Sequence, residues 1–77
     1  MGSRLPVLNG RNVVRIFGEF GWQLARQSAS HMVLTKAGDM VSLCVPDHKE
    51  VARGTLRSLI RSAGLTVDEF TTAVNSK

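Results

Sequence analysis

The sequence predicts a small α+β domain of order α-β-β-β-α, with a three-stranded antiparallel sheet, helices on one face of it and an extra short C-terminal helix. Two patterns predict this fold class. Apolar residues recur with helical spacing near both ends of the chain, whereas the segment between them alternates apolar and polar residues around closely spaced turns. The 77 residues, 43% of them hydrophobic and 21% charged, have the composition of one small globular domain.

The first predicted element is a helix that begins after Asn9 and ends near Phe20, behind a loose arm of residues 1–8. Asn9 is a suitable N-cap, because its side-chain oxygen can accept a hydrogen bond from the unpaired N–H groups of the first turn. Gly21 can adopt the left-handed conformation that commonly ends a helix. Residues 9–77 are predicted to form a single domain.

Three short strands are predicted next, at residues 22–27, 31–35 and 40–45. The polar residues 28–30 separate the first two strands, and Gly38 marks a hairpin turn before the third. Strands this close in sequence form an antiparallel meander.

Two further helices complete the predicted domain. Thr55 is expected to cap a helix over residues 56–63, whose apolar side chains repeat at i, i+3, i+4 and i+7, and Gly64 ends it. A capping-box pattern at residues 66–69 opens a last short helix that reaches Val74. Helices packed on one face of the sheet would leave the other face open, which suits a ligand surface.

The net charge of +4 is unevenly distributed. Residues 1–38 contain five basic side chains and one acidic side chain, whereas residues 39–77 are balanced. A basic half favours a polyanionic partner, of which nucleic acid is the commonest. Arg57 and Arg61 lie off the apolar stripe of their helix. A set of phosphate contacts and a merely solvated helix face are about equally good interpretations of this position. The residues expected to contact RNA are Arg26, Ser30, Lys36, Arg57 and Arg61.

Several functional classes are excluded by what the sequence lacks. No apolar run approaches the ~20 residues of a membrane span, and no secretory signal follows Met1, so a cytoplasmic protein is expected. The single cysteine cannot form an intramolecular disulfide or a zinc site alone, and we expect no metal and no cofactor. Cys44 is expected to be an inert thiol buried in the third strand, and the core is expected to include Trp22, Met32 and Met40.

His31 is the candidate catalytic residue. It begins the predicted second strand directly after Ser30, which we expect to orient it, and an imidazole can exchange protons near neutral pH. Two histidines with adjacent cations could together cleave RNA without a metal ion, one taking the 2′-hydroxyl proton and the other protonating the leaving oxygen while a cation holds the phosphate. For His31 the alternative interpretation is a structural histidine held by a hydrogen bond. For His48 the favoured interpretation is a loop histidine that packs or caps. Ser28 has no base, acid and oxyanion hole to make it a nucleophile.

Three segments together carry a family resemblance. Residues 21–31 read Gly-Trp-Gln-Leu-Ala-Arg-Gln-Ser-Ala-Ser-His, residues 45–48 read Val-Pro-Asp-His, and residues 54–65 read Gly-Thr-Leu-Arg-Ser-Leu-Ile-Arg-Ser-Ala-Gly-Leu. In this combination the chain resembles the HicA toxins of bacterial and archaeal toxin–antitoxin pairs, over about residues 9–74.

The resemblance implies a double-stranded-RNA-binding-like fold and an endoribonuclease that cuts messenger RNA and so arrests translation. It also implies a HicB-like antitoxin as partner, His31 as the catalytic residue and an auxiliary or structural role for His48. The glycine that the family has before Ser-His is Ala29 here, and a positive φ at that position would strain the turn by about 1 kcal/mol. The alternatives are a non-catalytic RNA-binding module and a degenerate toxin of the same fold.

Overall fold

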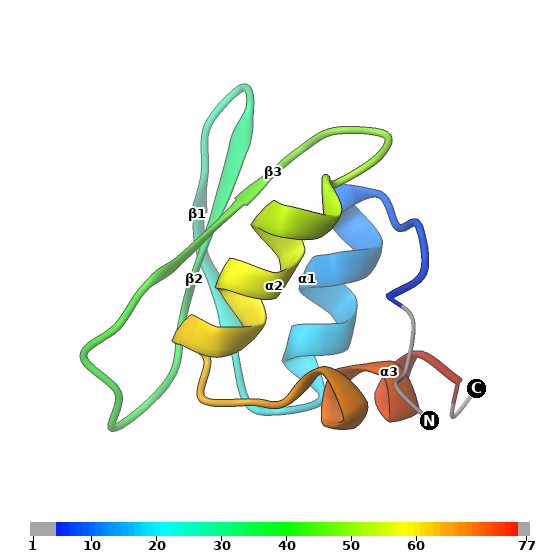
Figure 1. Cartoon of the computed structure of the whole chain (residues 1–77). Coiled ribbons are helices and arrows are strands. Elements are labelled where there is room, and N and C mark those ends of the chain that lie inside the picture. The colour runs from blue at the N-terminus through cyan, green and yellow to red at the C-terminus, as the bar shows by residue number, and fades with distance from the viewer. Residues whose placement is uncertain (1–4, 76–77) are drawn as a thin grey trace.

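The computed structural model describes residues 5–75, which form three helices and one three-stranded antiparallel sheet (Figure 1). This arrangement confirms the predicted α-β-β-β-α order with an extra C-terminal helix. Among the described residues, no helix combines the length and the apolar character needed to cross a bilayer. In chain order the elements are α1 (Gly10–Gly18), β1 (Gln23–Gln27), β2 (His31–Thr35), β3 (Leu43–Pro46), α2 (Arg53–Ser62) and α3 (Val67–Asn75).

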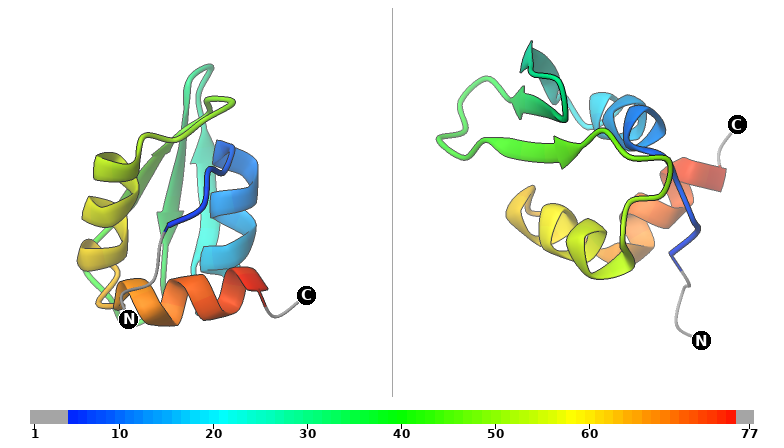
Figure 2. Two further views of the ribbon diagram at one scale, coloured as in Figure 1. Left: turned by 45° about the vertical axis from the view of Figure 1, so that its right-hand side comes forward. Right: turned by 90° about the horizontal axis from the view of Figure 1, so that it is seen from above.

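The sheet and the helices form two layers. Neighbouring strands pair in the order β1-β2-β3, and α1 and α2 cover the same face of this sheet (Figure 2). The start of α1, the turn between β1 and β2, and the end of β3 lie at one end of the molecule, with α3 across the other end (Figure 1). Within residues 5–75, no helix covers the second face of the sheet, as the sequence predicts.

Both ends of α1 follow the predicted chemistry. The N–H of Asn12 donates to the side chain of Asn9 at 2.8 Å, which confirms Asn9 as the N-cap. At the other end Gly21 has φ +97°, and the N–H of Trp22 donates back to the carbonyl of Phe17 at 3.2 Å. This left-handed stop ends the regular helix at Gly18, shortly before the expected boundary.

The third strand is shorter than expected and begins at Leu43 instead of residue 40. The carboxylate of Asp39 accepts a hydrogen bond from the N–H of Val41 at 2.9 Å, directly after Gly38 with φ +83°. This local bond keeps the segment in a loop, because a backbone group held by a side chain cannot join a strand ladder. Met40 is fully exposed in this loop, so its predicted place in the core is wrong.

The start of α2 also differs from the prediction. The helix begins at Arg53, and its N-cap is Ala52, which makes no side-chain cap bond. The N–H of Leu56 donates to the carbonyl of Ala52 at 2.9 Å, so Thr55 already lies inside the first turn and is not the cap. Backbone hydrogen bonding, and not a side-chain cap, therefore starts this helix.

The predicted capping box is confirmed at the start of α3. The N–H of Thr66 donates to the Glu69 carboxylate at 2.8 Å, and the N–H of Glu69 donates to the Thr66 hydroxyl at 3.0 Å. Each residue thus satisfies a backbone donor of the other. Gly64, with φ +77°, provides the sharp stop between α2 and α3.

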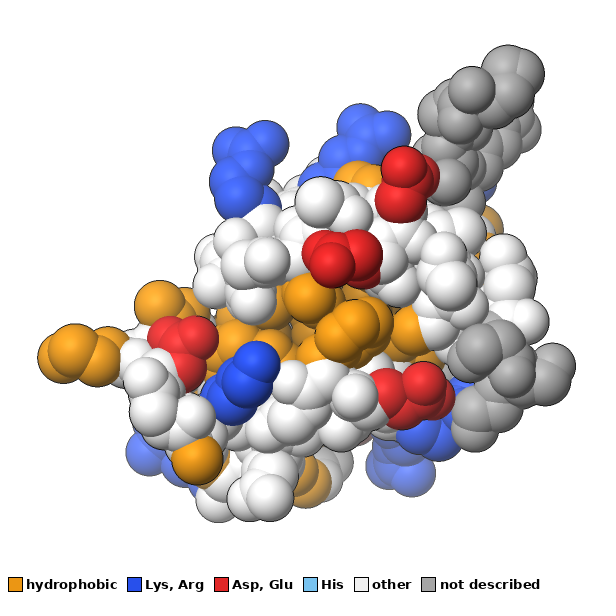
Figure 3. Space-filling view, turned by 90° about the horizontal axis from the view of Figure 1, so that it is seen from below, with side chains coloured by type: hydrophobic (Ala, Val, Ile, Leu, Met, Phe, Trp, Pro, Cys, Tyr) orange, Lys and Arg blue, Asp and Glu red, His pale blue; other side chains and the backbone are white. Residues whose placement is uncertain are grey.

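The α3 end of the molecule contains a hollow of about 440 Å³, which we name the α1–α3 hollow. Figure 3 shows this end, where hydrophobic side chains remain visible with acidic side chains around them. The hollow is lined by Glu19, Phe20, Asp68, Glu69, Thr72 and Ala73.

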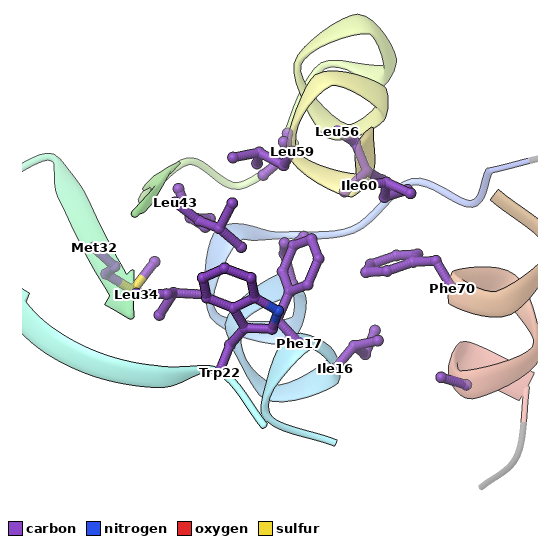
Figure 4. Packing of buried hydrophobic residues seen from close by; sticks show 14 of the residues in the cluster. Ile16, Phe17, Trp22, Met32, Leu34, Leu43, Leu56, Leu59, Ile60 and Phe70 are labelled. Carbon is purple, nitrogen blue, oxygen red and sulfur yellow. The ribbon is translucent and has the colours of Figure 1, made fainter. Parts of the chain in front are cut away.

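The hydrophobic core lies between the sheet and the three helices. Figure 4 shows Phe17 between Trp22 and Phe70, and the two phenylalanine rings lie 5.1 Å apart at 54°, a tilted contact. Trp22 and Met32 are buried as predicted. The buried hydrophobic residues are Leu5, Val13, Ile16, Phe17, Trp22, Met32, Leu34, Leu43, Val45, Val51, Leu56, Leu59, Ile60, Phe70 and Ala73.

Candidate functional site

The open face of the sheet presents three cross-strand rows of side chains. In β2 the buried residues Met32 and Leu34 face the helices, so their neighbours along the strand face the open side. Residues directly opposite each other in a sheet share a face. The rows are Gln23 with Thr35, Arg26 with Val33 and Cys44, and His31 with Pro46.

A bulge in β1 decides where Arg26 points. The pairing register shifts between Leu24, which lies opposite Leu34, and Arg26, which lies opposite Val33. If the strand were regular, without this shift, Arg26 would lie opposite Met32, on the helix-covered face. The bulge therefore turns the Arg26 side chain to the open face, a re-aiming that bulges commonly perform next to functional sites.

Arg26 and His31 line one hollow of about 390 Å³ on this face, which we name the His31 hollow. Cys44 lines the same hollow and is exposed, so the prediction of a buried thiol is wrong. Leu43 and Val45 face the core, and the strand period of two then places Cys44 on the opposite face. That alternation was the sequence signal for the thiol's position. The lining residues are Arg26, Gln27, Ser28, His31, Val33 and Cys44.

The imidazole of His31 is exposed and has a serine at one of its two nitrogens. Ser30 Oγ lies 3.0 Å from Nδ1, so Ser30 contacts the ring that it was predicted to orient. When Nδ1–H donates to the hydroxyl, Nε2 carries the lone pair and can take a proton. When the ring is protonated, Nε2 can donate a proton.

The turn that carries His31 is held without backbone strain. No described residue other than glycine has a positive φ, so Ala29 sits in an ordinary conformation and the strain considered for it is absent. The main chain of Ser28 donates to the carbonyl of His31 at 2.9 Å, which closes the turn. Alanine in place of the family's glycine is therefore compatible with this turn.

The other predicted RNA contacts lie outside the His31 hollow. Lys36 follows the far end of β2, about 16 Å along the strand from His31 by the rise of an extended chain, and its Nζ lies 6.0 Å from the centre of the Trp22 ring. Arg57 and Arg61 are exposed on α2, as predicted, and belong to the helical layer rather than the open face.

His48 is exposed in the loop after β3 and does not line the hollow. Its carbonyl accepts a hydrogen bond from the N–H of Gly10 at 2.9 Å, so its backbone ties the loop to the start of α1. The neighbouring carboxylate of Asp47 lies 3.8 Å from the guanidinium of Arg11. The contacts of this segment are structural.

The side chains of the His31 hollow determine the chemistry available there. The hollow contains one cation and one imidazole, and none of its lining residues is acidic. Across residues 5–75, no group of three or more His, Cys, Asp or Glu side chains is placed to hold a metal ion. The arrangement can bind a phosphate through Arg26 and transfer a proton through His31.

Comparison with known families gives one match. The model of a family described as the HicA toxin of bacterial toxin-antitoxin matches residues 10–65. A search of curated proteins gives no match. The matched range runs from the first residue of α1 to the residue after the Gly64 stop, so it includes the whole sheet and the His31 hollow.

Proposed function

Because the chain belongs to the HicA toxins of bacterial toxin–antitoxin systems, we propose that it is an endoribonuclease that cuts messenger RNA and arrests translation. The observation that supports this best is the meeting of Arg26 and His31 in one exposed hollow. A cation at the phosphate and a proton-transfer group beside it are the minimum that RNA cleavage requires.

In the proposed reaction the ribose 2′-oxygen attacks the adjacent phosphorus. As the 2′-oxygen–phosphorus bond forms, Nε2 of His31 accepts the 2′-hydroxyl proton. The bond from phosphorus to the 5′-oxygen breaks, and that oxygen takes a proton from the imidazolium or from water. Arg26 stabilises the negative charge that grows on the phosphate oxygens. The products are a 2′,3′-cyclic phosphate and a free 5′-hydroxyl, and no metal ion takes part.

RNA binding is proposed to extend beyond the His31 hollow. A nucleic-acid strand presents a phosphate at every nucleotide, so cations spread over the surface can contact it together. Ser30, Lys36, Arg57 and Arg61 are the further residues assigned to this contact. Such binding is electrostatic and tolerant of sequence, and it takes place in the cytoplasm, where messenger RNA is translated.

A HicB-like antitoxin is the proposed protein partner. A free toxin would harm its own cell, so inhibition must be tight, and a partner that covers His31 achieves it without altering the chemistry. A standard interface takes about 800 Å² from each partner. We expect an antitoxin more acidic than this chain, because charge complementarity speeds association with a basic surface. Solvent protection of His31 in the complex is the measurement that checks whether the antitoxin covers this residue.

The function is tested with purified protein and messenger RNA in the presence of EDTA. The proposal predicts cleavage that survives the chelator and leaves 2′,3′-cyclic phosphate ends or their hydrolysis products. Activity that disappears in EDTA and returns only with Mg²⁺ or Mn²⁺ would contradict the metal-independent mechanism. RNA binding with no cleavage would instead identify a non-catalytic module or a degenerate toxin of the same fold. Induced expression in cells that lack the antitoxin adds the growth arrest expected of a toxin.

A further inference from the structure

The backbone of His31 is held from inside its own turn by Ser28. The Ser28 hydroxyl accepts from the N–H of His31 at 3.2 Å and donates to its carbonyl at 3.3 Å. The N–H of Ser28 adds a third contact, to the same carbonyl, at 2.9 Å. One residue thus binds both main-chain groups of His31, while the ring is left to Ser30.

The same turn is held from outside by the segment that follows β3. The N–H of Asp47 donates to the carbonyl of Ser30 at 2.9 Å, and Pro46 lies opposite His31 in the strand register. A movement of the Pro46–Asp47 segment would therefore displace Ser30, the residue immediately before His31.

Gly10 sets the position of this segment. It is buried at the start of α1, and its N–H donates to the carbonyl of His48 at 2.9 Å. A Cβ added at Gly10 would lie 2.2 Å from the Pro46 carbonyl oxygen and 3.1 Å from the Asp47 Cα. These are backbone atoms, so they cannot rotate away as a side chain would. Close approach of the two main chains requires glycine here.

We propose that Ser28 and Gly10 are positioning residues for His31: Ser28 fixes its main chain, and Gly10 lets the Pro46–Asp47 segment lie close enough to hold the turn. This inference rests on the proposed catalytic role of His31. Neither residue needs to touch RNA for this role. Misplacement of a reacting group by about 1 Å can lower a rate by ~10²-fold, so a small displacement of the turn is sufficient to be measured.

The exposed Ser28 gives the first test, because its substitution leaves the core untouched. Ser28→Ala is expected to lower kcat about tenfold with KM nearly unchanged, since the cationic binding surface stays in place. The amide of His31 should exchange faster with solvent. Ser28→Thr retains the hydroxyl and should restore both values. Ser42→Ala, an exposed serine in the loop before β3, is the matched control and should behave as wild type.

Gly10→Ala gives the second test, with Gly18→Ala as its control in the same helix. A Cβ at Gly18 meets nothing within 4 Å, so that variant should keep wild-type kcat. Gly10→Ala should expose the Asp47 amide to exchange and lower kcat in the fraction that folds. If Gly10→Ala does not fold, the Ser28 variants decide the proposal.

The possible outcomes separate this inference from the proposed function. Wild-type kcat in Ser28→Ala, alongside an inactive His31→Ala, would overturn the positioning role while leaving the nuclease in place. Full activity of a folded His31→Ala would overturn the proposed function instead. In that case the exchange rates of the His31 and Asp47 amides still show whether Ser28 and Gly10 hold the turn.

Discussion

The His31 hollow and the α1–α3 hollow are similar in size and opposite in chemistry. The first, of about 390 Å³, lies on an exposed sheet face and contains Arg26 and His31. The second, of about 440 Å³, lies at the other end of the molecule and has three carboxylate side chains around Phe20 and Ala73. A phosphate is attracted to the first hollow and repelled by the second.

The volume of a hollow alone therefore does not identify the site of RNA chemistry. The α1–α3 hollow is the larger of the two, yet neither a cation nor an imidazole lines it. Its carboxylates are partly used to build the fold, since Glu69 accepts from the N–H of Thr66. Arg26 and His31 in the other hollow are placed by a bulge in β1 and by a tight turn before β2.

Among the changes that compare the two hollows, removal of the cation of the His31 hollow should have the largest effect on RNA cleavage. Arg26→Ala is expected to lower RNA cleavage by ~10²–10³-fold, the usual loss when one group that stabilises transition-state charge is removed. Arg26→Lys keeps the charge but not the planar fork, so it should recover only part of the rate. Glu19→Gln in the α1–α3 hollow is the matched control. Equal losses of cleavage in Arg26→Ala and Glu19→Gln would contradict the assignment of RNA chemistry to the His31 hollow.

A large side chain placed in each hollow tests which of the two hollows RNA enters. Cys44 and Thr72 are exposed residues that line the His31 hollow and the α1–α3 hollow, respectively. Cys44→Trp should lower cleavage by about tenfold or more, because RNA loses its near-attack position beside His31. Thr72→Trp should leave the rate unchanged. The check is the cleavage rate of both variants at equal concentrations of folded protein.

A smaller effect is expected from the arginines of α2, which lie in neither hollow. Removal of Arg57 and Arg61 together should lower the slope of log affinity against log salt by about 0.7 for each lost phosphate contact with single-stranded RNA. The measurement is RNA binding by the inactive His31→Ala protein over a range of salt concentrations. An unchanged slope and affinity would assign these two arginines to solvation.

Much of the fold was predictable because its signals are local. The Asn9 cap, the capping box at Thr66 and the apolar stripe of α2 depend on residues within one or two turns of each other. The same holds for Gly21, whose positive φ ends α1. The ends of the helices and strands were less predictable. The hydrogen bond between Asp39 and Val41 competes with the strand ladder, so β3 begins only at Leu43.

The sequence could propose candidate site residues but not how they are arranged. His31, Ser30 and Arg26 could be selected from the sequence, but the β1 bulge has no compositional signal. That bulge decides which face Arg26 occupies. The Asp47–Ser30 hydrogen bond joins two segments distant in sequence and depends on the tertiary packing of Gly10. Long-range contacts of this kind require the structure.

His31, and not His48, is proposed to transfer the proton in RNA cleavage. The most direct test is the cleavage rate of purified His31→Ala and His48→Ala on the same messenger RNA. Folding of both variants is verified by their amide spectra. Loss of the general acid–base should lower the rate of His31→Ala by ~10²–10⁴-fold. His48→Ala should remain near wild type, because its side chain lies outside the His31 hollow. A folded His31→Ala protein that still cleaves at the wild-type rate would contradict the account.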